Sequence, residues 1–400
     1  MRAAQIITRR IVGGAQRIAL ETAAALRARG DECEIWCGPQ TGPEGDLGGE
    51  ARERGVPLRI VPDLVREVDP ARDLRARSWL LREMRDGGFD VVHTHSSKAG
   101  ILGRRAAHEA RKRPAAGVPA PRAILHTVHG WGWSDRTAPA ARVLFAALER
   151  AAFGWADRVV AVSERVREEG LRQGIGREEP DRYRVILPGI DTAPFRALLD
   201  AEAAASVRAR SREALDIPAD AVVAGTVGRL SSQKNPEAIL ALAARFPDLH
   251  LLLIGDGPLR ANLERTIAQR GWSARVRMPG IRTDVAACLA ALDLFVLPSL
   301  WEGLPLTILE ARCAGLPVIA SGVGGVSEAM PEPAAGWIVP PGDAGALERA
   351  VADWFGRRRE AREAALAGRF DVLQKGSRSR MLEEILSLYD SLLGSPPLAR

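Results

Sequence analysis

The residues with the clearest chemical potential are two glutamates, Glu302 and Glu310, within the segment 294–320. This segment has the pattern of a strand, a loop, a helix and a second strand. Pro305 suits the first turn of the helix, and Gly315 suits its end. Glu302 would then lie at the carboxyl end of a parallel strand, where open α/β sheets bind ligands. Taken alone, two glutamates at this spacing would more often be surface groups.

The loop and the helix start between the two glutamates are suited to a diphosphate. Their backbone N–H groups would face one crevice, with the positive end of the helix dipole behind them. Glu310 would accept hydrogen bonds from a ribose diol, while Glu302 would reach past the phosphates toward a sugar. We therefore expect substrate contacts from Gly303, Leu304, Leu306, Thr307 and Glu310.

Two cations follow an earlier predicted strand. Arg229 comes directly after Gly228, and Lys234 lies a short way further along. Two fixed cations at the end of a strand would neutralise the negative charge that builds on a phosphate as a nucleotide leaves. A Gly-Arg pair alone would more often be structural, so a catalytic role for Arg229 and Lys234 depends on the glutamate motif.

Together these motifs resemble the retaining glycosyltransferases of family 4, which have the two-domain GT-B fold and the hallmark Glu-x7-Glu. Here the hallmark is Glu302-x7-Glu310. The resemblance implies a nucleotide diphosphate sugar as donor, retained anomeric configuration, and catalytic roles for Glu302 and the two cations. It also implies that the backbone of segments 252–259 and 276–281 lines a nucleoside pocket. The substrate-binding residues expected around that pocket are Gly228, Gly255, Met278 and Ile281.

In the first half of the chain, the candidate residues are glycines and histidines. Gly13 and Gly14 come between the first predicted strand and helix, where glycine lets a ligand approach the backbone closely, although a plain tight turn would use the same residues. His129 follows another predicted strand, and it matches the family position that contacts the donor sugar near the reacting centre. His95 is a second candidate at a strand end.

Two segments of the first half suggest contact with a lipid or a sugar. Trp131 and Trp133 offer flat apolar surfaces that would stack on a sugar ring or meet a lipid carrier, but burial in the domain core explains them equally well. The segment 73–82 combines arginines with Trp79 and would suit an anionic membrane surface. Peripheral membrane contact is thus left open.

Alternating short apolar runs and amphipathic helical stretches must position these residues, a pattern that predicts parallel sheets covered by helices. The chain has 400 residues, which suits two domains. We expect an α/β protein of GT-B architecture, with two Rossmann-like domains facing across a cleft. The acceptor-side domain would span 1–190, the nucleotide-sugar domain 191–376, and a last helix within 377–400 would be free to pack back on the N-terminal domain. Strands are predicted at 4–8, 32–37, 90–93, 123–128, 158–162, 184–187, 222–227, 249–254, 275–278, 294–297 and 317–320.

Sequence composition and short patterns predict the cellular location, the state of the cysteines and the absence of a metal. No apolar run is long enough to span a bilayer, and the N-terminus lacks a secretory signal, so we expect a cytoplasmic protein. The cysteines Cys33, Cys37, Cys288 and Cys313 show no zinc-binding spacing and are expected to be buried thiols. No Asp-x-Asp pair occurs in the sequence, which favours a site without metal or other cofactor.

The expected partners are a nucleotide-sugar donor and a glycan, glycolipid or small-molecule acceptor, in cell-surface polysaccharide or glycolipid synthesis. One alternative is a nucleotide-sugar epimerase or a sugar phosphorylase, because a fold does not determine a reaction. The net charge of +6 also suits a nucleic-acid-binding protein. That alternative is disfavoured, because no binding motif is found and acidic residues are interleaved with the arginines.

Overall fold

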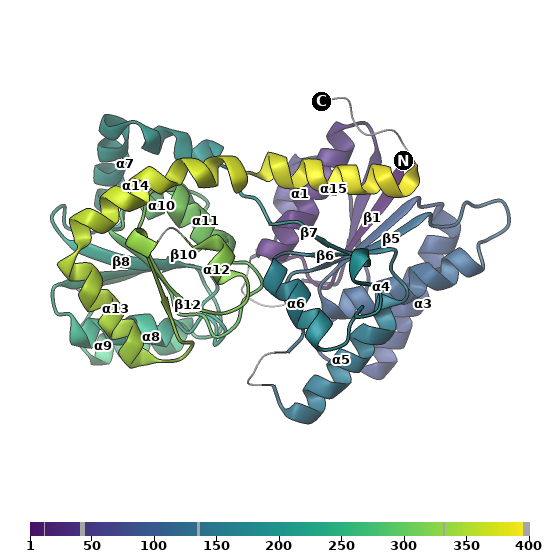
Figure 1. Ribbon diagram of the computed structural model, residues 1–400, viewed down its shortest axis with the longest axis horizontal. Coiled ribbons are helices and arrows are strands. Elements are labelled where there is room, and N and C mark those ends of the chain that lie inside the picture. The colour runs from purple at the N-terminus through teal and green to yellow at the C-terminus, as the bar shows by residue number, and fades with distance from the viewer. Residues whose placement is uncertain (12, 41–44, 134–136, 331–332, 395–400) are drawn as a thin grey trace. The chain divides into compact units, whose positions relative to one another are not determined.

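The computed structural model describes residues 1–11, 13–40, 45–133, 137–330 and 333–394. The chain divides into two compact units (Figure 1). The first unit consists of Met1–Leu187 together with the C-terminal segment that begins at Ser379, and the second unit is Pro188–Arg378. Each unit is a parallel sheet with helices on both faces, as expected for Rossmann-like domains.

The first unit contains a seven-stranded parallel sheet in the order β3-β2-β1-β4-β5-β6-β7. Its strands are β1 (Arg2–Ile7), β2 (Glu32–Cys37), β3 (Leu58–Ile60), β4 (Val91–His95), β5 (Ala123–Val128), β6 (Arg158–Ala161) and β7 (Tyr183–Val185). The strand order reverses between β1 and β4, which are hydrogen-bonded neighbours. Such a switch point is where open α/β sheets place their ligands.

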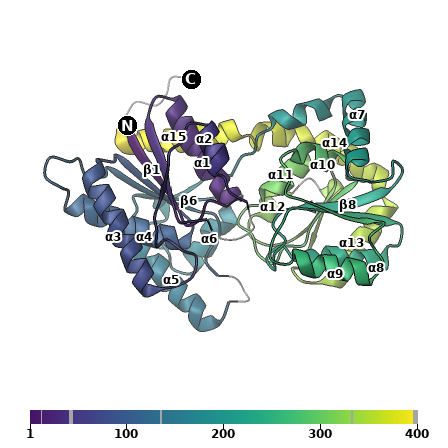
Figure 2. The ribbon, with the colours of Figure 1, turned by 180° about the vertical axis from the view of Figure 1, so that it is seen from behind.

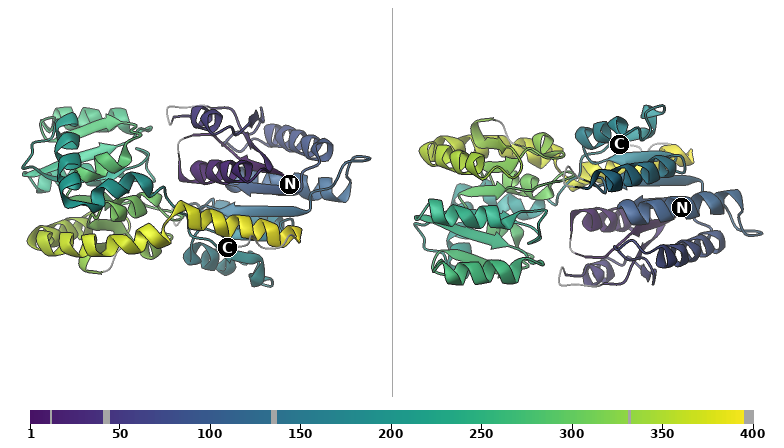
Figure 3. Two further views of the ribbon diagram at one scale, coloured as in Figure 1. Left: turned by 90° about the horizontal axis from the view of Figure 1, so that it is seen from above. Right: turned by 90° about the horizontal axis from the view of Figure 1, so that it is seen from below.

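Helices cover both faces of the first sheet. Its helices are α1 (Gly14–Ala28), α2 (Gly48–Glu53), α3 (Pro70–Gly87), α4 (Ser97–Lys112), α5 (Pro139–Phe153), α6 (Glu164–Arg172), the short helix η1 (Pro180–Arg182) and α15 (Arg378–Leu393). Apolar side chains of α1 and α15 pack on one face, and those of α3 and α4 pack on the other. The last helix, drawn in yellow in Figure 3, therefore completes the core of the first unit.

The second unit contains a six-stranded parallel sheet in the order β10-β9-β8-β11-β12-β13. Its strands are β8 (Val222–Val227), β9 (Leu249–Ile254), β10 (Val276–Gly280), β11 (Leu294–Leu297), β12 (Val318–Ser321) and β13 (Gly336–Val339). Here the order reverses between β8 and β11. The carboxyl ends of these two strands carry the cations and the first glutamate identified in the sequence.

The helices of the second unit also form two layers (Figure 2). They are η2 (Ala193–Leu199), α7 (Ala201–Ala214), α8 (Pro236–Arg245), α9 (Arg260–Gln269), α10 (Val285–Ala290), α11 (Leu306–Cys313), α12 (Val326–Ala329), η3 (Pro333–Ala335), α13 (Ala344–Gly356) and α14 (Arg358–Lys375). The helices α7, α10 and α11 pack on one face of the sheet, and α8, α9 and α13 pack on the other.

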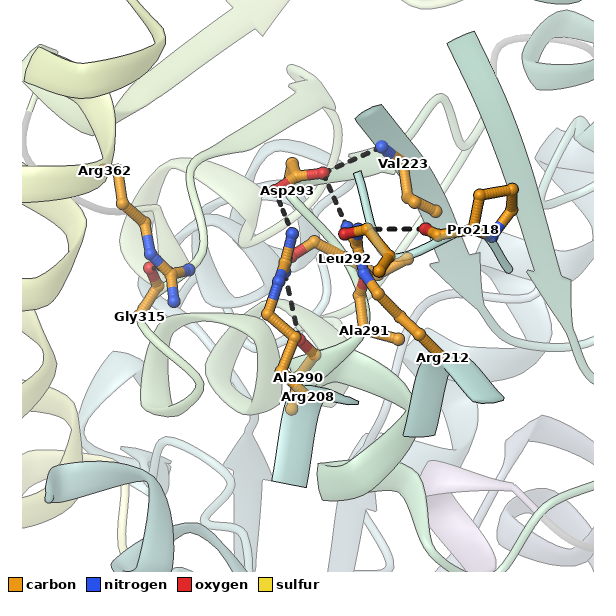
Figure 4. Close-up of polar contacts among 11 residues, drawn as sticks. Arg208, Arg212, Pro218, Val223, Ala290, Ala291, Leu292, Asp293, Gly315 and Arg362 are labelled. Carbon is orange, nitrogen blue, oxygen red and sulfur yellow. Dashed lines mark hydrogen bonds and ion pairs between the residues drawn. The ribbon is translucent and has the colours of Figure 1, made fainter. Parts of the chain in front are cut away.

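A polar cluster fastens α7 to this sheet (Figure 4). Asp293 accepts hydrogen bonds from Arg208 at 2.6 Å and from Arg212 at 3.0 Å. The same carboxylate accepts from the backbone N–H of Val223 at 2.8 Å, at the start of β8. Because one carboxylate joins two arginines to a strand start, the cluster supports the strand that leads to the catalytic candidates.

Several expectations about the fold can be compared with the structure. The two predicted sheets are present, and the strands expected at 32–37, 123–128, 222–227, 249–254 and 294–297 have those bounds. The short strands β3 and β13 were not predicted. The four cysteines are buried and form no disulfide, as expected. Among the described residues, no helix is both long and apolar enough to cross a membrane.

Candidate active site

The second unit brings two of the predicted catalytic residues into direct contact. Lys234 Nζ donates a hydrogen bond to Glu302 Oε1 over 2.6 Å. Lys234 follows β8 and Glu302 follows β11, so the ion pair lies at the switch point of the sheet. The Glu302 side chain is 7% exposed and that of Lys234 is 21% exposed. The surrounding protein therefore limits solvent screening of the pair.

Gln233, which the sequence did not single out, connects the two loops. The backbone N–H of Leu300 donates to the carbonyl oxygen of Gln233 at 2.8 Å. The side-chain Nε2 of Gln233 donates to the carbonyl oxygen of Trp301 at 2.9 Å. These bonds on either side hold the loop that ends in Glu302 against the loop that carries Lys234. In the sequence, the only indication that Gln233 belongs to the site was its position next to Lys234.

A glycine pair behind Glu302 was also missed as part of the site. Gly324 has a φ of +51°, and a Cβ atom there would lie 2.1 Å from the carbonyl oxygen of Glu302. The next residue, Gly325, donates its N–H to the carbonyl oxygen of Gly303 at 2.5 Å. Both the left-handed backbone and the close approach require glycine at position 324. The glycine-rich segment after β12 thus supports the glutamate loop.

The helix α11 begins one residue later than the sequence suggested. Pro305 has a ψ of 109° and is the N-cap, while its carbonyl oxygen accepts the N–H of Ile308 at 3.1 Å. The expectation that Pro305 lies within the first turn was therefore wrong by one position, because an N-cap residue is itself extended. The N–H groups of Leu306 and Thr307 belong to the first turn, where no helical carbonyl can accept them.

The remaining residues of the glutamate motif occupy this loop and helix. Gly303 is buried, whereas Leu304, Leu306 and Thr307 are partly exposed. Glu310 lies on the second turn of α11 and is also partly exposed. The arrangement places N–H donors ahead of a carboxylate along a single helix. It has the local chemistry that a diphosphate joined to a ribose requires.

The strand ends on the other side of β8 gather the predicted nucleoside-pocket residues. Gly255 has a φ of +130°, and a Cβ atom there would lie 2.0 Å from the carbonyl oxygen of Gly228. The N–H of Gly255 donates to the carbonyl oxygen of Gly280 at 2.8 Å, which adds the end of β10. Met278 is partly exposed in β10, and Ile281, just after it, is exposed. Arg229 is partly exposed beside Gly228.

The first unit places its candidate residues after β1, β4 and β5, three neighbouring strands of its sheet. Gly13 is the N-cap of α1, the helix that follows β1 in the chain, and Gly14 is its first residue. His95 ends β4, and His129 follows β5. His95 Nδ1 and His129 Nε2 are 2.9 Å apart, so the two histidines share a hydrogen bond. The structure therefore joins the two candidate histidines to each other.

Loss of hydration lowers the pKa of both histidines. The pKa of His129 is lowered to about 3 because the protein removes water from around the ring. Desolvation, assisted by the neighbouring histidines, holds the pKa of His95 well below its ordinary value. At neutral pH each ring therefore has one N–H donor and one nitrogen acceptor.

Trp131 and Trp133 pack against each other and against α6. Their rings are stacked with centroids 5.1 Å apart. Trp131 Nε1 donates to the carbonyl oxygen of Val166 at 2.9 Å, and Trp133 Nε1 donates to Glu169 at 3.3 Å. The sequence left open whether these side chains contact a sugar or lipid or are buried in the domain core. The structure favours packing within the domain.

Comparison with known protein families covers both units. The model of the glycosyl transferases group 1 family matches residues 207–369, and that of glycosyltransferase family 4 matches residues 12–194. The chain is similar to an Escherichia coli UDP-Gal:alpha-D-GlcNAc-diphosphoundecaprenol alpha-1,3-galactosyltransferase, with 31% identity over 79% of this chain and 78% of the relative. It is also similar to a D-inositol 3-phosphate glycosyltransferase of Saccharomonospora viridis, with 27% identity over 94% of this chain and 89% of the relative.

Among solved structures, the chain is similar to Anabaena HepE in complex with UDP-glucose. The TM-score is 0.78 at 20% identity, over 98% of this chain and 100% of HepE. This likeness confirms the fold. The two family models and the galactosyltransferase relative show that this chain belongs to the family 4 glycosyltransferases of group 1 and transfers sugars from nucleotide-sugar donors.

Proposed function

We propose that this glycosyltransferase takes a hexose from a UDP-sugar and adds it, with retention of configuration, to a lipid-linked glycan on the cytoplasmic side of a membrane. The ion pair between Lys234 and Glu302 at 2.6 Å carries the proposal, because it joins the glutamate motif to the cation after β8. The names of the E. coli relative and of the HepE complex support a UDP-sugar, and the former supports a diphosphate-linked lipid acceptor.

In this proposal, the acceptor hydroxyl attacks the anomeric carbon while the bond from that carbon to the β-phosphate oxygen breaks. The leaving phosphate takes the proton of the acceptor hydroxyl, so UDP departs with the charge balanced. Arg229 and Lys234 stabilise the negative charge that develops on the phosphate. Glu302 orients Lys234 and contacts the sugar, while His129 of the first unit binds a sugar hydroxyl and Gly13 and Gly14 allow close approach of the backbone.

The reaction type is tested with a labelled UDP-sugar and a lipid-linked acceptor. We expect labelled product only when both substrates are present, whereas an epimerase would convert the donor without an acceptor. A phosphorylase would need inorganic phosphate instead. Donor conversion in the absence of acceptor, at the rate seen in its presence, would contradict the proposal.

Glu310 is expected to bind the ribose of the nucleotide. In a thermal-shift titration, Glu310→Gln should weaken UDP binding by about tenfold or more, since a hydrogen bond to a charged group contributes about 1.5–3 kcal/mol. Binding of 2′-deoxy-UDP should change much less, because that ligand lacks one of the hydroxyl partners. Glu363→Gln, on the exposed surface of α14, is the control. Equal losses for UDP and 2′-deoxy-UDP would refute the ribose contact.

We further propose that the lipid contact lies on α5 and not on the segment 73–82. In α3, Arg75 is paired with Asp63 at 3.0 Å, and Trp79 packs edge-on against Trp36. These groups are thus engaged within the protein. By contrast, α5 exposes an apolar row at helical spacing, formed by Ala140, Val143, Leu144, Ala147, Leu148 and Ala151.

The charges of α5 suit an anionic lipid surface. Arg142 is partly exposed and pairs with Glu169 at 3.3 Å, and Arg150 is exposed and donates to the carbonyl oxygen of Gln173. The single acidic residue of α5, Glu149, is buried. A helix with an apolar row bordered by arginines, and with no exposed carboxylate of its own, is suited to lie in the interface of an anionic bilayer. Lipid-linked acceptors are found at that interface.

Flotation with vesicles that contain anionic lipid tests this surface. Leu144→Glu should reduce the fraction bound to vesicles by roughly tenfold, because an apolar side chain of this size contributes about 1.5–3 kcal/mol when buried. The matched control is Leu74→Glu in α3, where an equally exposed leucine lies within the segment 73–82. If only the Leu74 variant lost vesicle binding, the lipid contact would lie on α3 and not on α5.

A further inference from the structure

A row of polar side chains crosses the interior of the first unit. Gln5 in β1, His93 and His95 in β4, Thr127 in β5 and Tyr389 in α15 are all almost completely buried. The strands align Gln5 with His93 and His95 with Thr127 as register partners. Buried polar groups are costly unless each has a hydrogen-bond partner, so such a row within a hydrophobic core calls for an explanation.

The row forms one continuous path of hydrogen bonds that ends at His129. Gln5 Nε2 donates to Tyr389 Oη at 2.8 Å, and Gln5 Oε1 lies 2.8 Å from His95 Nε2. His95 Nδ1 lies 2.9 Å from His129 Nε2. On its other side, Tyr389 Oη is 2.6 Å from His93 Nδ1. All of these residues belong to the first unit.

With the Gln5 amide oriented so that its Nε2 faces Tyr389, the donor and acceptor roles along this path follow. The amide oxygen of Gln5 can only accept, so His95 must donate from Nε2. A neutral imidazole has a single N–H, which leaves His95 Nδ1 as an acceptor. The proton between the two histidines must therefore reside on His129 Nε2. His129 then has a lone pair on Nδ1, since the hydrogen bond at one ring nitrogen determines the tautomer.

The hydrogen bonds of Tyr389 fit this direction at the opposite end of the path. The Tyr389 oxygen accepts from Gln5, so its own O–H is available to donate to His93 Nδ1. His93 Nε2 then donates to Thr127 Oγ1 over 2.7 Å. If the Gln5 amide were reversed, every bond on the path would reverse, and His129 would have its proton on Nδ1.

We propose that Tyr389, on the C-terminal helix, is a positioning residue: through Gln5 and His95 it holds His129 as the neutral Nε2–H tautomer, whose Nδ1 accepts a hydrogen bond from a hydroxyl of the bound sugar. The hydroxyl contact rests on the proposed function, whereas the tautomer is a property of the ligand-free chain. Tyr389 contacts no substrate in this arrangement and acts only through the histidines.

The tautomer is measured by long-range ¹H–¹⁵N correlation spectra of the full chain with ¹⁵N-labelled histidine, and His129→Asn assigns the signals. We expect His129 to be neutral with its proton on Nε2. A proton on Nδ1, or a charged ring at neutral pH, would overturn the proposal. Because the spectra need no substrate, this result is independent of whether UDP-sugars are the donors.

Tyr389→Phe then tests whether the Tyr389 hydroxyl determines the tautomer of His129. The variant should show a mixture of His129 tautomers and about tenfold lower kcat, with little change in KM for the donor, as when a supporting partner of a site residue is removed. Tyr183→Phe is the matched control: Tyr183 is also buried in the first unit, but its hydroxyl donates to the carbonyl oxygen of Ile175 at 3.2 Å. Only the Tyr389 variant should alter the tautomer. An unchanged His129 spectrum in Tyr389→Phe, or the same change in both variants, would exclude this role for Tyr389.

Discussion

Lys234→Ala is expected to lower kcat for sugar transfer by about a hundredfold or more, because removal of one preorganised group that stabilises transition-state charge has effects of this size. The donor phosphate would lose the cation that offsets its developing charge. The variant would also leave the carboxylate of Glu302 without its 2.6 Å partner. Steady-state rates with saturating donor and acceptor measure the effect.

Lys375→Ala is the matched control for this experiment. Lys375 also forms an ion pair at 2.6 Å, with Asp371, but it lies on the exposed surface of α14. Its replacement should leave kcat unchanged, which separates loss of an ion pair from loss of a catalytic cation. Turnover by the Lys234 variant within a few-fold of the original chain would remove Lys234 from the mechanism.

Glu149→Ala is expected to destabilise the first unit by about 3–5 kcal/mol, the usual result of leaving one charge of a buried pair without its partner. Arg104 Nη2 donates to Glu149 Oε2 over 2.6 Å, between α4 and α5. The two side chains are 1% and 2% exposed. Hydrogen–deuterium exchange of peptides from α4 and α5 would report the stability of this unit alone.

Two further variants separate the buried charge from other effects. Glu179→Ala removes an ion pair with Arg182 in which the glutamate side chain is 58% exposed, so it should cost about 1 kcal/mol or less. The double replacement Arg104→Met and Glu149→Leu should regain most of the stability, because it leaves no buried charge. If Glu149→Ala cost no more than Glu179→Ala, the buried pair would have no special role.

The sheets were predictable because parallel strands that are buried on both faces form continuous apolar runs. The run at β11 was of this kind, and its bounds needed no correction. The edge strands β3 and β13 escaped prediction because they are short and partly exposed. Arg59 in the centre of β3 breaks its apolar run, and Ile338 in β13 is half exposed.

The contact between Lys234 and Glu302 has a different physical basis. Strand ends at a switch point meet at one edge of the sheet, so residues that follow β8 and β11 must come close together. The sequence analysis named Lys234 and Glu302 from the family resemblance, and the structure adds that β8 and β11 are neighbours. Gln233 and Gly324, which hold the same loops, make their contacts through backbone carbonyl oxygens, and a sequence motif does not specify such contacts.

The hydrogen-bonded path from Tyr389 to His129 could not be predicted from the sequence, for a third reason. Gln5 and Tyr389 are separated by 384 positions, and only the three-dimensional packing of α15 brings them together. His95 and His129 were candidates in the sequence, but no sequence pattern links them to Gln5 or Tyr389. Local patterns thus locate strand ends, whereas hydrogen bonds between distant elements require the packed core.

The membership of α15 in the first unit bears on how the protein is made. Domains generally fold as units while the ribosome is still translating the chain, with the N-terminal one first. Here the N-terminal domain lacks Tyr389 and the apolar face of α15 until the whole second domain has been synthesised. The apolar surface that α15 covers in the folded protein therefore lacks this helix until α15 itself has been synthesised.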